Sequence, residues 1–350
     1  MPEPRGRSHA EGVYVAGMGV GPRDGLHRFL RRGAQWEGEQ LAMVDNLLAL
    51  AWHPVLPVVY GLSGLGREGL VHVWDVSGEG AVALGETPSG GAEPCHVAIS
   101  PGGELLVVAN YATGSLRIWP LGEEGSLLGA GEGVELKGAS VDPERQEGSH
   151  PHHVSFHGGL LRVIDLGADL VRTFAVSANG GGAVVTPVRE TTVPAGTGPR
   201  HGVTLPGGEV VLSGELASTV LAGGLDDREG WYVSSSTERT ARAMSERPRN
   251  YPGDIQRSDD GRYVYVANRG LDTISTLAVG QGAPRLVSEV DSGVVWPQHL
   301  LVSGSELLVA GRGDSRVVAL ALDDGLPGDP RTLFDCAAAC WLLPLRRNRL

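Results

Sequence analysis

The chain has 350 residues, a formal net charge of −12 at pH 7 and a hydrophobic content of 41%. This hydrophobic content excludes a mainly disordered chain, and the negative charge argues against nonspecific binding to nucleic acids or to anionic membranes. Three cysteines are too few for a disulfide framework, no apolar run reaches membrane-spanning length, and the N-terminus lacks the apolar segment of a secretory signal. We therefore expect a reduced, cytoplasmic protein.

In chain order, the sequence repeats one pattern of short alternating apolar runs separated by turn residues. The copies cover 13–30, 46–75 and 95–121, and later copies begin at His153, His201, Asp254 and His299. Short alternating runs between turns are typical of antiparallel strands. Because the later copies begin about 50 residues apart, the sequence predicts an all-β, seven-bladed β-propeller with about four antiparallel strands per blade.

The segments between the copies are expected to hold the fourth, outer strands and the loops between blades. These segments are 122–149, 176–199, 222–250 and 279–295. The first is rich in Gly and Glu, and we expect residues 122–150 to be long and mobile. The apolar stretch 331–345 is expected to pair with the first blade and close the ring, which removes an open sheet edge. The prediction is one propeller domain over 12–345, with a flexible N-terminal tail (1–11) and a C-terminal tail (346–350).

Titratable residues gather where the first strand of each unit opens. The residue before that strand and the residue that opens it form the pairs Cys95-His96, His152-His153, Arg200-His201, Gly253-Asp254 and Gln298-His299. Equivalent positions of a propeller are related by its pseudo-rotation axis. We therefore expect these side chains to form a ring around one end of the central channel.

A second ring is expected at the turn after the middle strand. Its pairs are Asn110-Tyr111, Asp165-Leu166, Gly214-Glu215, Asn268-Arg269 and Gly311-Arg312. A turn that requires positive φ explains the Asn and Gly residues, but it does not explain the neighbouring Glu and Arg residues. We therefore expect Glu215, Arg269 and Arg312 at equivalent points of a solvent-lined channel mouth, where they contribute little to packing.

The first ring has a structural interpretation as well as a functional one. His96, His201 and His299 could each form hydrogen bonds that link strands, whereas His152 and Arg200 lie one residue off that position.

Metal and cofactor binding are not expected. The tract 149–153 is rich in histidine, but it has no helical His-x3-His pair, and a zinc site needs converging ligands. No haem-attachment motif, phosphate-binding loop or Gly-x-Ser-x-Gly motif is present.

The units that begin near residues 95, 149, 197 and 254 resemble the seven-bladed propeller lactonases, which include propeller-type 6-phosphogluconolactonases and carboxymuconate-lactonising enzymes. The resemblance covers roughly residues 40–345 and rests on His-Pro-His at 150–152, Gly-Pro-Arg-His at 198–201, an acidic residue and then Asn-Arg-Gly at 268–270. It implies a site of His152 (or its neighbour His150), Arg200, Glu215 and Arg269. The chain departs from the family at Gly214, where Asn is common, and at 311–315, which replaces an Asn-led turn.

The resemblance implies hydrolysis of a sugar lactone, most closely 6-phosphoglucono-δ-lactone, by an activated water. His152 would be the general base, and Glu215 would orient it or be the base itself. Arg200 or Arg269 would stabilise the carbonyl oxygen, and the remaining arginine with Arg312 would bind the phosphate. Further candidates for substrate binding are His150, His153, His201, His96 and His299.

Two other functions fit the same fold. A non-catalytic ligand- or protein-binding propeller is expected to expose a large apolar or aromatic patch, and the aromatic content of 5% disfavours it. A lactonising lyase that acts on a dicarboxylic acid would use the same residues, so only a substrate test separates it. The expected partner of the enzyme is a small anionic sugar lactone, and the chain is expected to be a monomer or a weak homo-oligomer.

Overall fold

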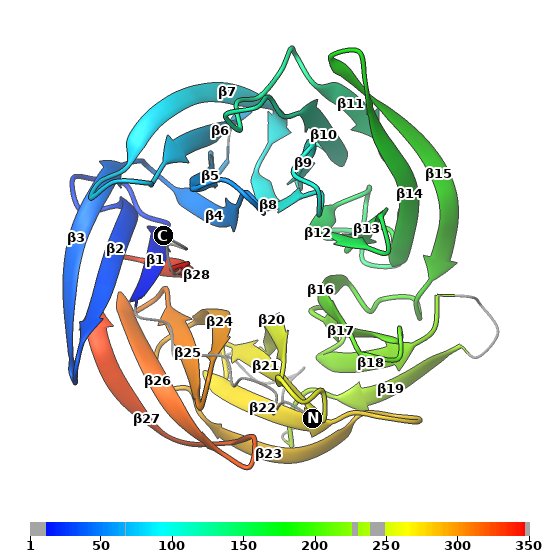
Figure 1. The fold of residues 1–350 in the computed structure, drawn as a ribbon. Helices are drawn as coiled ribbons and strands as arrows, with labels where there is room; N and C mark the ends of the chain where they lie inside the picture. The colour runs from blue at the N-terminus through cyan, green and yellow to red at the C-terminus, as the bar shows by residue number, and fades with distance from the viewer. Residues whose placement is uncertain (1–11, 67, 226–229, 239–248, 347–350) are drawn as a thin grey trace, which may run out of the picture.

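The computed structural model describes residues 12–66, 68–225, 230–238 and 249–346. Within these residues, 28 β-strands form seven antiparallel four-stranded sheets around a central channel, and no helix occurs (Figure 1). The predicted seven-bladed propeller is therefore confirmed. The predicted tail over 1–11 lies outside the described residues. In the described part of the chain, no helix is long and apolar enough to cross a membrane.

Each blade extends from an inner strand beside the channel to an outer strand at the rim (Figure 1). The first blade combines both ends of the chain in β28 (Ala339–Pro344), β1 (Gly12–Gly17), β2 (Gly25–Arg32) and β3 (Gln35–Met43). The second and third blades contain β4 (Leu47–Trp52), β5 (Val58–Ser63), β6 (Glu68–Asp75), β7 (Val82–Ala92), β8 (Pro94–Ile99), β9 (Leu105–Asn110), β10 (Ser115–Pro120) and β11 (Glu132–Glu135). The fourth and fifth contain β12 (Pro151–His157), β13 (Leu160–Asp165), β14 (Leu170–Asn179), β15 (Gly182–Thr192), β16 (Pro199–Thr204), β17 (Val210–Gly214), β18 (Thr219–Gly223) and β19 (Trp231–Ser235). The sixth and seventh contain β20 (Tyr251–Arg257), β21 (Tyr263–Arg269), β22 (Thr273–Ala278), β23 (Arg285–Asp291), β24 (Pro297–Ser303), β25 (Glu306–Gly311), β26 (Arg316–Asp323) and β27 (Leu326–Asp335).

The core lies between neighbouring blades. Both faces of a middle strand contact another sheet, so β5 and β9 are buried at every position and read as continuous apolar runs. Tyr60 of the second blade packs with Leu106 and Trp119 of the third, and all three are fully buried. Each such large side chain stabilises the fold by about 1.5–3 kcal/mol. Apolar packing between neighbouring blades therefore holds the ring together.

The ring is closed by the C-terminal strand. β28 pairs antiparallel with β1, with Val15 opposite Leu342, so the predicted closure is confirmed for Ala339–Pro344. It is wrong for residues 331–335, which belong to β27 and pair with β26 of the seventh blade, because a turn at 336–338 separates the two strands. Arg346, the first residue of the predicted C-terminal tail, places its guanidinium 4.9 Å from the Trp52 ring centroid, and 347–350 lie outside the described residues.

The turns after the middle strands differ from the expectation for Asn110, Gly214, Asn268 and Gly311. These residues are the last or next-to-last residues of their strands and do not have positive φ. The left-handed residue lies four positions later in each turn, at Gly114, Ser218, Asp272 and Ser315. Asn110 is instead buried, and its side-chain amide donates to the Ser89 carbonyl at 3.1 Å. Burial and hydrogen bonding therefore explain the Asn110 side chain. The residue with positive φ is the one four positions later in the turn.

Candidate functional site

The inner strands share a local irregularity that positions the first ring. In all seven blades the pairing of the inner strand shifts register close to its start. A bulge of this kind adds a residue to one strand and re-aims the neighbouring side chains. The residues at these shifts include Leu48, Cys95, His152, Gln298 and Cys340, which all line one cavity at the channel mouth.

Two residues that precede inner strands reach the same cavity through strained backbone. Glu93 and Trp296 have φ of 53° and 58°, and both line the cavity. Positive φ is rare for a bulky residue. The backbone N–H of Trp296 donates to Asp272 Oδ1 at 2.9 Å, and its ring lies 5.6 Å from the Arg269 guanidinium carbon. The Trp296 ring therefore lies against a cavity arginine, in a cation–π contact.

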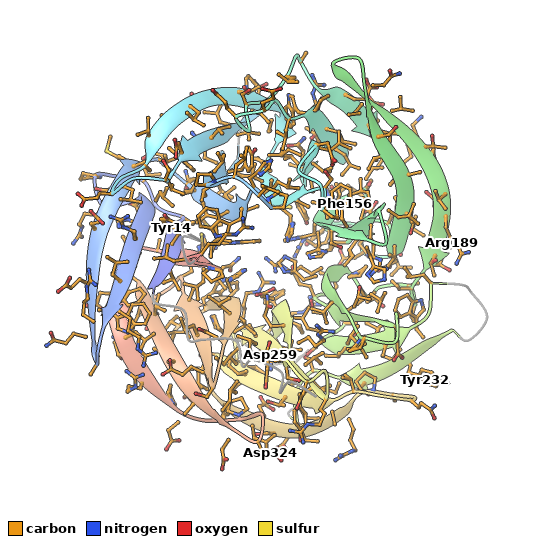
Figure 2. All side chains as sticks on the ribbon, in the orientation of Figure 1. Tyr14, Phe156, Arg189, Tyr232, Asp259 and Asp324 are labelled. Carbon is orange, nitrogen blue, oxygen red and sulfur yellow. The ribbon has the colours of Figure 1, made fainter. Side chains whose placement is uncertain are left out.

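The cavity at the channel mouth has a volume of about 320 Å³, which suits one small ligand. Its lining contains four arginines and two carboxylates, namely Arg145, Arg200, Arg269, Arg312, Glu93 and Glu215. Two positive charges therefore remain after these groups offset one another, although the chain as a whole carries −12. Figure 2 shows side chains that project from the blades toward the centre of the ring. A local excess of positive charge in a cleft attracts anions.

Glu215 is the centre of a buried ionic cluster. Its Oε1 accepts a hydrogen bond from Arg145 Nη2 at 2.8 Å, and its Oε2 accepts one from Arg269 Nη2 and lies 3.1 Å from Arg200 Nε. Burial alone would raise the pKa of Glu215, but the charges of Arg269 and Arg200 hold that pKa well below its usual range. Glu215 is therefore an ionised carboxylate that binds three guanidinium groups.

This cluster corrects the expectation of a solvent-lined site that contributes little to packing. Arg200, Glu215 and Arg269 are only 4%, 5% and 7% exposed. Their charges are separated from water and compensate one another, so removing one leaves its partners buried and unpaired. Activity and stability are therefore coupled at these positions.

A chain of hydrogen bonds holds the Arg200 side chain in place. Arg200 Nη1 donates to His201 Nε2 at 3.1 Å, and His201 Nδ1 donates to Asp254 Oδ1 at 2.9 Å. Because Arg200 can only donate, Nε2 of His201 must be the acceptor and Nδ1 must carry the proton. Asp254 also accepts from the backbone N–H of Ile255 and of Leu300, both at 2.9 Å. The fifth, sixth and seventh blades thus position one arginine together.

His152 faces the cavity with an unprotonated ring. Burial and the nearby Arg200 lower the pKa of His152 well below its usual value, although Glu215 opposes the shift. Its Nδ1 is buried without a hydrogen-bond partner, and its ring centroid lies 5.2 Å from that of His201 and 5.5 Å from that of Tyr111. His152 is therefore a neutral base beside a guanidinium group.

Further neutral histidines lie next to the lining residue His201. The ring centroids of His96 and His153 are 4.2 Å apart, and each lies within 5.4 Å of the His201 centroid. Burial lowers the pKa of all three, to about 3 for His153. Among the residues the structure describes, no group of three His, Cys, Asp or Glu side chains could hold a metal ion.

The end of the Gly- and Glu-rich connector folds back into the site, which sequence reasoning missed. Gln146 is fully buried and donates from Nε2 to the Leu166 carbonyl at 2.9 Å. This hydrogen bond holds the end of the connector in place, so that Arg145 reaches Glu215. Arg145 Nη2 also lies 3.3 Å from the Tyr111 hydroxyl. The expectation of a mobile segment is therefore wrong for its last residues, because hydrogen bonds and burial fix them.

The structure brings seven of the ten predicted site residues to the cavity lining: His152, Arg200, Glu215, Arg269, His201, Arg312 and His299. The other three, His96, His150 and His153, are not part of the lining. His150 instead stacks on Tyr111 at a centroid distance of 4.5 Å and contacts Glu147 Oε1 at 3.1 Å. Lining residues absent from the predicted set include Tyr111, Arg145, Trp296, Gln298 and Trp341.

Comparison with known proteins agrees with this architecture. The family described as lactonase, seven-bladed β-propeller, matches residues 21–331. The chain belongs to this family. The 6-phosphogluconolactonase of Bacillus subtilis is 27% identical over 309 residues, which cover 84% of this chain and 85% of that protein. An uncharacterised protein of Lactococcus lactis is 30% identical over 237 residues, so the chain spans 66% of that relative's length.

Solved structures with this propeller fold superpose on most of the chain. A protein from Lactobacillus plantarum has a TM-score of 0.86 at 24% identity and covers 96% of this chain and 100% of its own. A periplasmic gluconolactonase from Pseudomonas aeruginosa has a TM-score of 0.83 at 22% identity, with 95% and 98% covered. At these identities the similarity establishes the shared fold.

Proposed function

We propose that the chain hydrolyses a small anionic sugar lactone in the channel-mouth cavity, and that 6-phosphoglucono-δ-lactone is its substrate. The observation that carries the proposal is a cavity of about 320 Å³ in which a neutral imidazole, His152, lies among four arginines. Relatives named 6-phosphogluconolactonase at 27% and 25% identity support the same reaction class.

In this proposal His152 is the general base. Water attacks the lactone carbonyl carbon while its proton passes to His152, and the tetrahedral intermediate then collapses. The ring C–O bond breaks, and the imidazolium returns the proton to the departing alkoxide, which becomes a hydroxyl group. A lactone carbonyl is already reactive, so an imidazole of lowered basicity is sufficient.

The buried arginines supply electrostatic stabilisation. Arg200 and Arg269 line the cavity and are held in place by Glu215, so their donors are fixed before negative charge develops on the carbonyl oxygen. Glu215 is a poor base, because these arginines hold its pKa far below neutral. Its role in this mechanism is to position the arginines.

Arg312 binds the anionic group of the substrate. It lines the cavity, and no carboxylate within ion-pair distance of it is found among the described residues. The other cavity arginines share Glu215, so Arg312 carries the charge that is least compensated. Guanidinium groups bind phosphate in a bidentate manner.

The test is a hydrolysis assay with phosphorylated and unphosphorylated gluconolactone, using Arg312→Met and, as a matched control, Arg316→Met. Arg316 lies four residues further on and is absent from the cavity lining. Loss of a charged hydrogen bond, worth about 1.5–3 kcal/mol, should raise KM about 10- to 100-fold for the phosphorylated lactone only. If the wild-type protein does not accelerate either lactone above its spontaneous hydrolysis, the proposed activity is wrong.

A further inference from the structure

A second arginine site lies at the other end of the fourth blade. Arg162, on β13, is only 7% exposed. It pairs across the sheet with Ser155 of β12 and Thr173 of β14. Its Nη1 donates to Thr204 Oγ1 of the fifth blade at 2.7 Å, whereas its Nε is buried without a partner. Buried donors are usually satisfied, so the Arg162 guanidinium keeps hydrogen-bonding capacity that the described residues do not use.

The positive charge at this place is also unbalanced. In the described part of the chain, no carboxylate forms an ion pair with Arg162 or with its neighbours Arg189 and Arg257. Arg257 Nη1 donates to the carbonyl of Thr204, the residue whose hydroxyl accepts from Arg162. Arginine remains protonated in proteins. Among the described residues, these three guanidinium groups therefore have no carboxylate partner, although the chain carries a net charge of −12.

Arg162 and Arg189 border a cavity of about 220 Å³, which we call the Arg162 pocket. Its polar lining is Arg162, Arg189, His157 and Thr173, and all of these side chains can donate hydrogen bonds. Figure 2 labels Arg189 on the outer strand of this blade and Phe156 on its inner strand. The volume is below the range of about 300–1,000 Å³ typical of larger ligands. The pocket therefore suits a small, strongly accepting anion.

We propose that the Arg162 pocket binds a tetrahedral oxyanion, either free phosphate or sulfate or the phosphate group of a small monoester. The anion accepts from the guanidinium groups of Arg162 and Arg189, which both line the pocket, and its charge compensates the buried guanidinium. Along β12, His157 is five residues from His152, which corresponds to about 16 Å of strand. The pocket is therefore a site separate from the proposed lactonase cavity.

The test is isothermal titration of the full-length protein with phosphate, sulfate, or methyl phosphate, at an ionic strength held constant with chloride. Thermal unfolding is followed in parallel, because a ligand of the native state raises Tm. Arg312→Met weakens anion binding in the channel, and the heat that is lost when Arg162→Met is added to this background reports the Arg162 pocket. Arg285→Met removes an exposed arginine and is the matched control.

Saturable binding of phosphate and a rise in Tm are expected for the wild type, Arg312→Met and Arg285→Met, with both lost when Arg162→Met is added to Arg312→Met. Without anion, Arg162→Met should be at least as stable as the wild type, because it removes an unpaired buried charge. If Arg162→Met does not fold, Arg189→Met, a change at an exposed residue, must weaken binding at least tenfold.

The source of the anion follows from the methyl phosphate arm. Equal binding of methyl phosphate and phosphate supports a monoester ligand, whereas binding of inorganic anions alone supports a free ion. The proposal is overturned if the Arg312→Met background binds none of the three anions, or if Arg162→Met and Arg189→Met bind them as the wild type does.

Discussion

At the scale of single residues, Glu215 connects the chemistry of the cavity to the stability of the fold. Burial lowers the pKa of Arg200 to about 10, and repulsion by the charge of Arg269 contributes to this shift. Glu215 offsets this repulsion by binding both. A carboxylate that neutralises two buried cations cannot be removed without a large energetic effect.

The first prediction concerns this carboxylate. Glu215→Gln should lower the free energy of unfolding by about 3–5 kcal/mol, because it leaves Arg200 and Arg269 buried without compensation. Arg145→Met is the contrast, since the Arg145 side chain is 37% exposed and a partly exposed ion pair contributes at most about 1 kcal/mol. Urea unfolding of both variants measures the difference. If both variants lose the same small amount of unfolding free energy, Glu215 and its arginines do not stabilise the fold as one ionic cluster.

The second prediction concerns the pH dependence of His152. Its pKa is lowered well below the usual value by burial and Arg200, so the imidazole remains unprotonated as the pH falls through about 6.5, the usual histidine pKa. The kcat/KM for an unphosphorylated lactone should therefore remain level between pH 8 and about 6, where an ordinary histidine base would already lose activity. An unphosphorylated substrate avoids the titration of the phosphate itself. A fall in kcat/KM centred near pH 6.5 would contradict the assignment.

Sequence repeats make part of this site predictable. Cys95, His152, Arg200 and Gln298 each stand between a proline and a His of the inner strand, and this Pro-x-His pattern marks the bulges at which side chains enter the cavity. Tyr111 occupies the same turn position as Glu215 and could have been found in the same way.

Arg145 could not be found from the repeats. It belongs to a connector present in a single blade, and only tertiary contacts bring it to Glu215. The sequence also does not show which histidines of the first ring line the cavity. This depends on the bulges, and a bulge is a property of strand pairing. His96 and His153 look equivalent to His201 in sequence, yet of these three only His201 lines the cavity.

At the scale of elements, closure by β28 decides whether the ring is continuous. β28 pairs only with β1 within its sheet, at the inner edge of the first blade. Cys340 and Leu342 are 2% and 1% exposed and belong to the clusters that join the first blade to its two neighbours. The same strand places Trp341 in the cavity lining. Fold closure and the site therefore depend on one strand.

The third prediction is that a chain ending at residue 338 loses much more stability than a chain ending at Arg346. The shorter chain lacks β28, so β1 becomes an open edge and large side chains of the first blade are exposed at about 1.5–3 kcal/mol each. The chain that ends at Arg346 keeps every described strand. Thermal unfolding compares the two with the full-length protein. A Tm of the shorter chain within a few degrees of the full-length value would show that β28 does not close the ring.

At the scale of the whole molecule, the propeller axis buries histidines in a neutral state. Burial is the main cause of the lowered pKa of His96, His152, His153, His201 and His299. In the unfolded chain these imidazoles have pKa values near about 6.5. The folded protein therefore binds fewer protons than the unfolded chain over the same pH range, and stability depends on pH through the whole channel.

The last prediction follows from this linkage. Groups with a lowered histidine pKa contribute their full stability above about pH 6.5, and this stability is lost as the pH falls toward the folded value, about 3 for His153. Each such group contributes a slope of up to about 1.4 kcal/mol per pH unit in that window. We expect the free energy of unfolding to be level from pH 8 to 7 and to fall steeply below about 6.5, before ordinary carboxylates titrate. His153→Phe keeps an aromatic ring beside His96, whose centroid is 4.2 Å away in the wild type. Because it removes one titrating group, it should reduce the slope of the free energy of unfolding by up to about 1.4 kcal/mol per pH unit. A slope that begins only below about pH 5 would show that the channel histidines take up protons without unfolding.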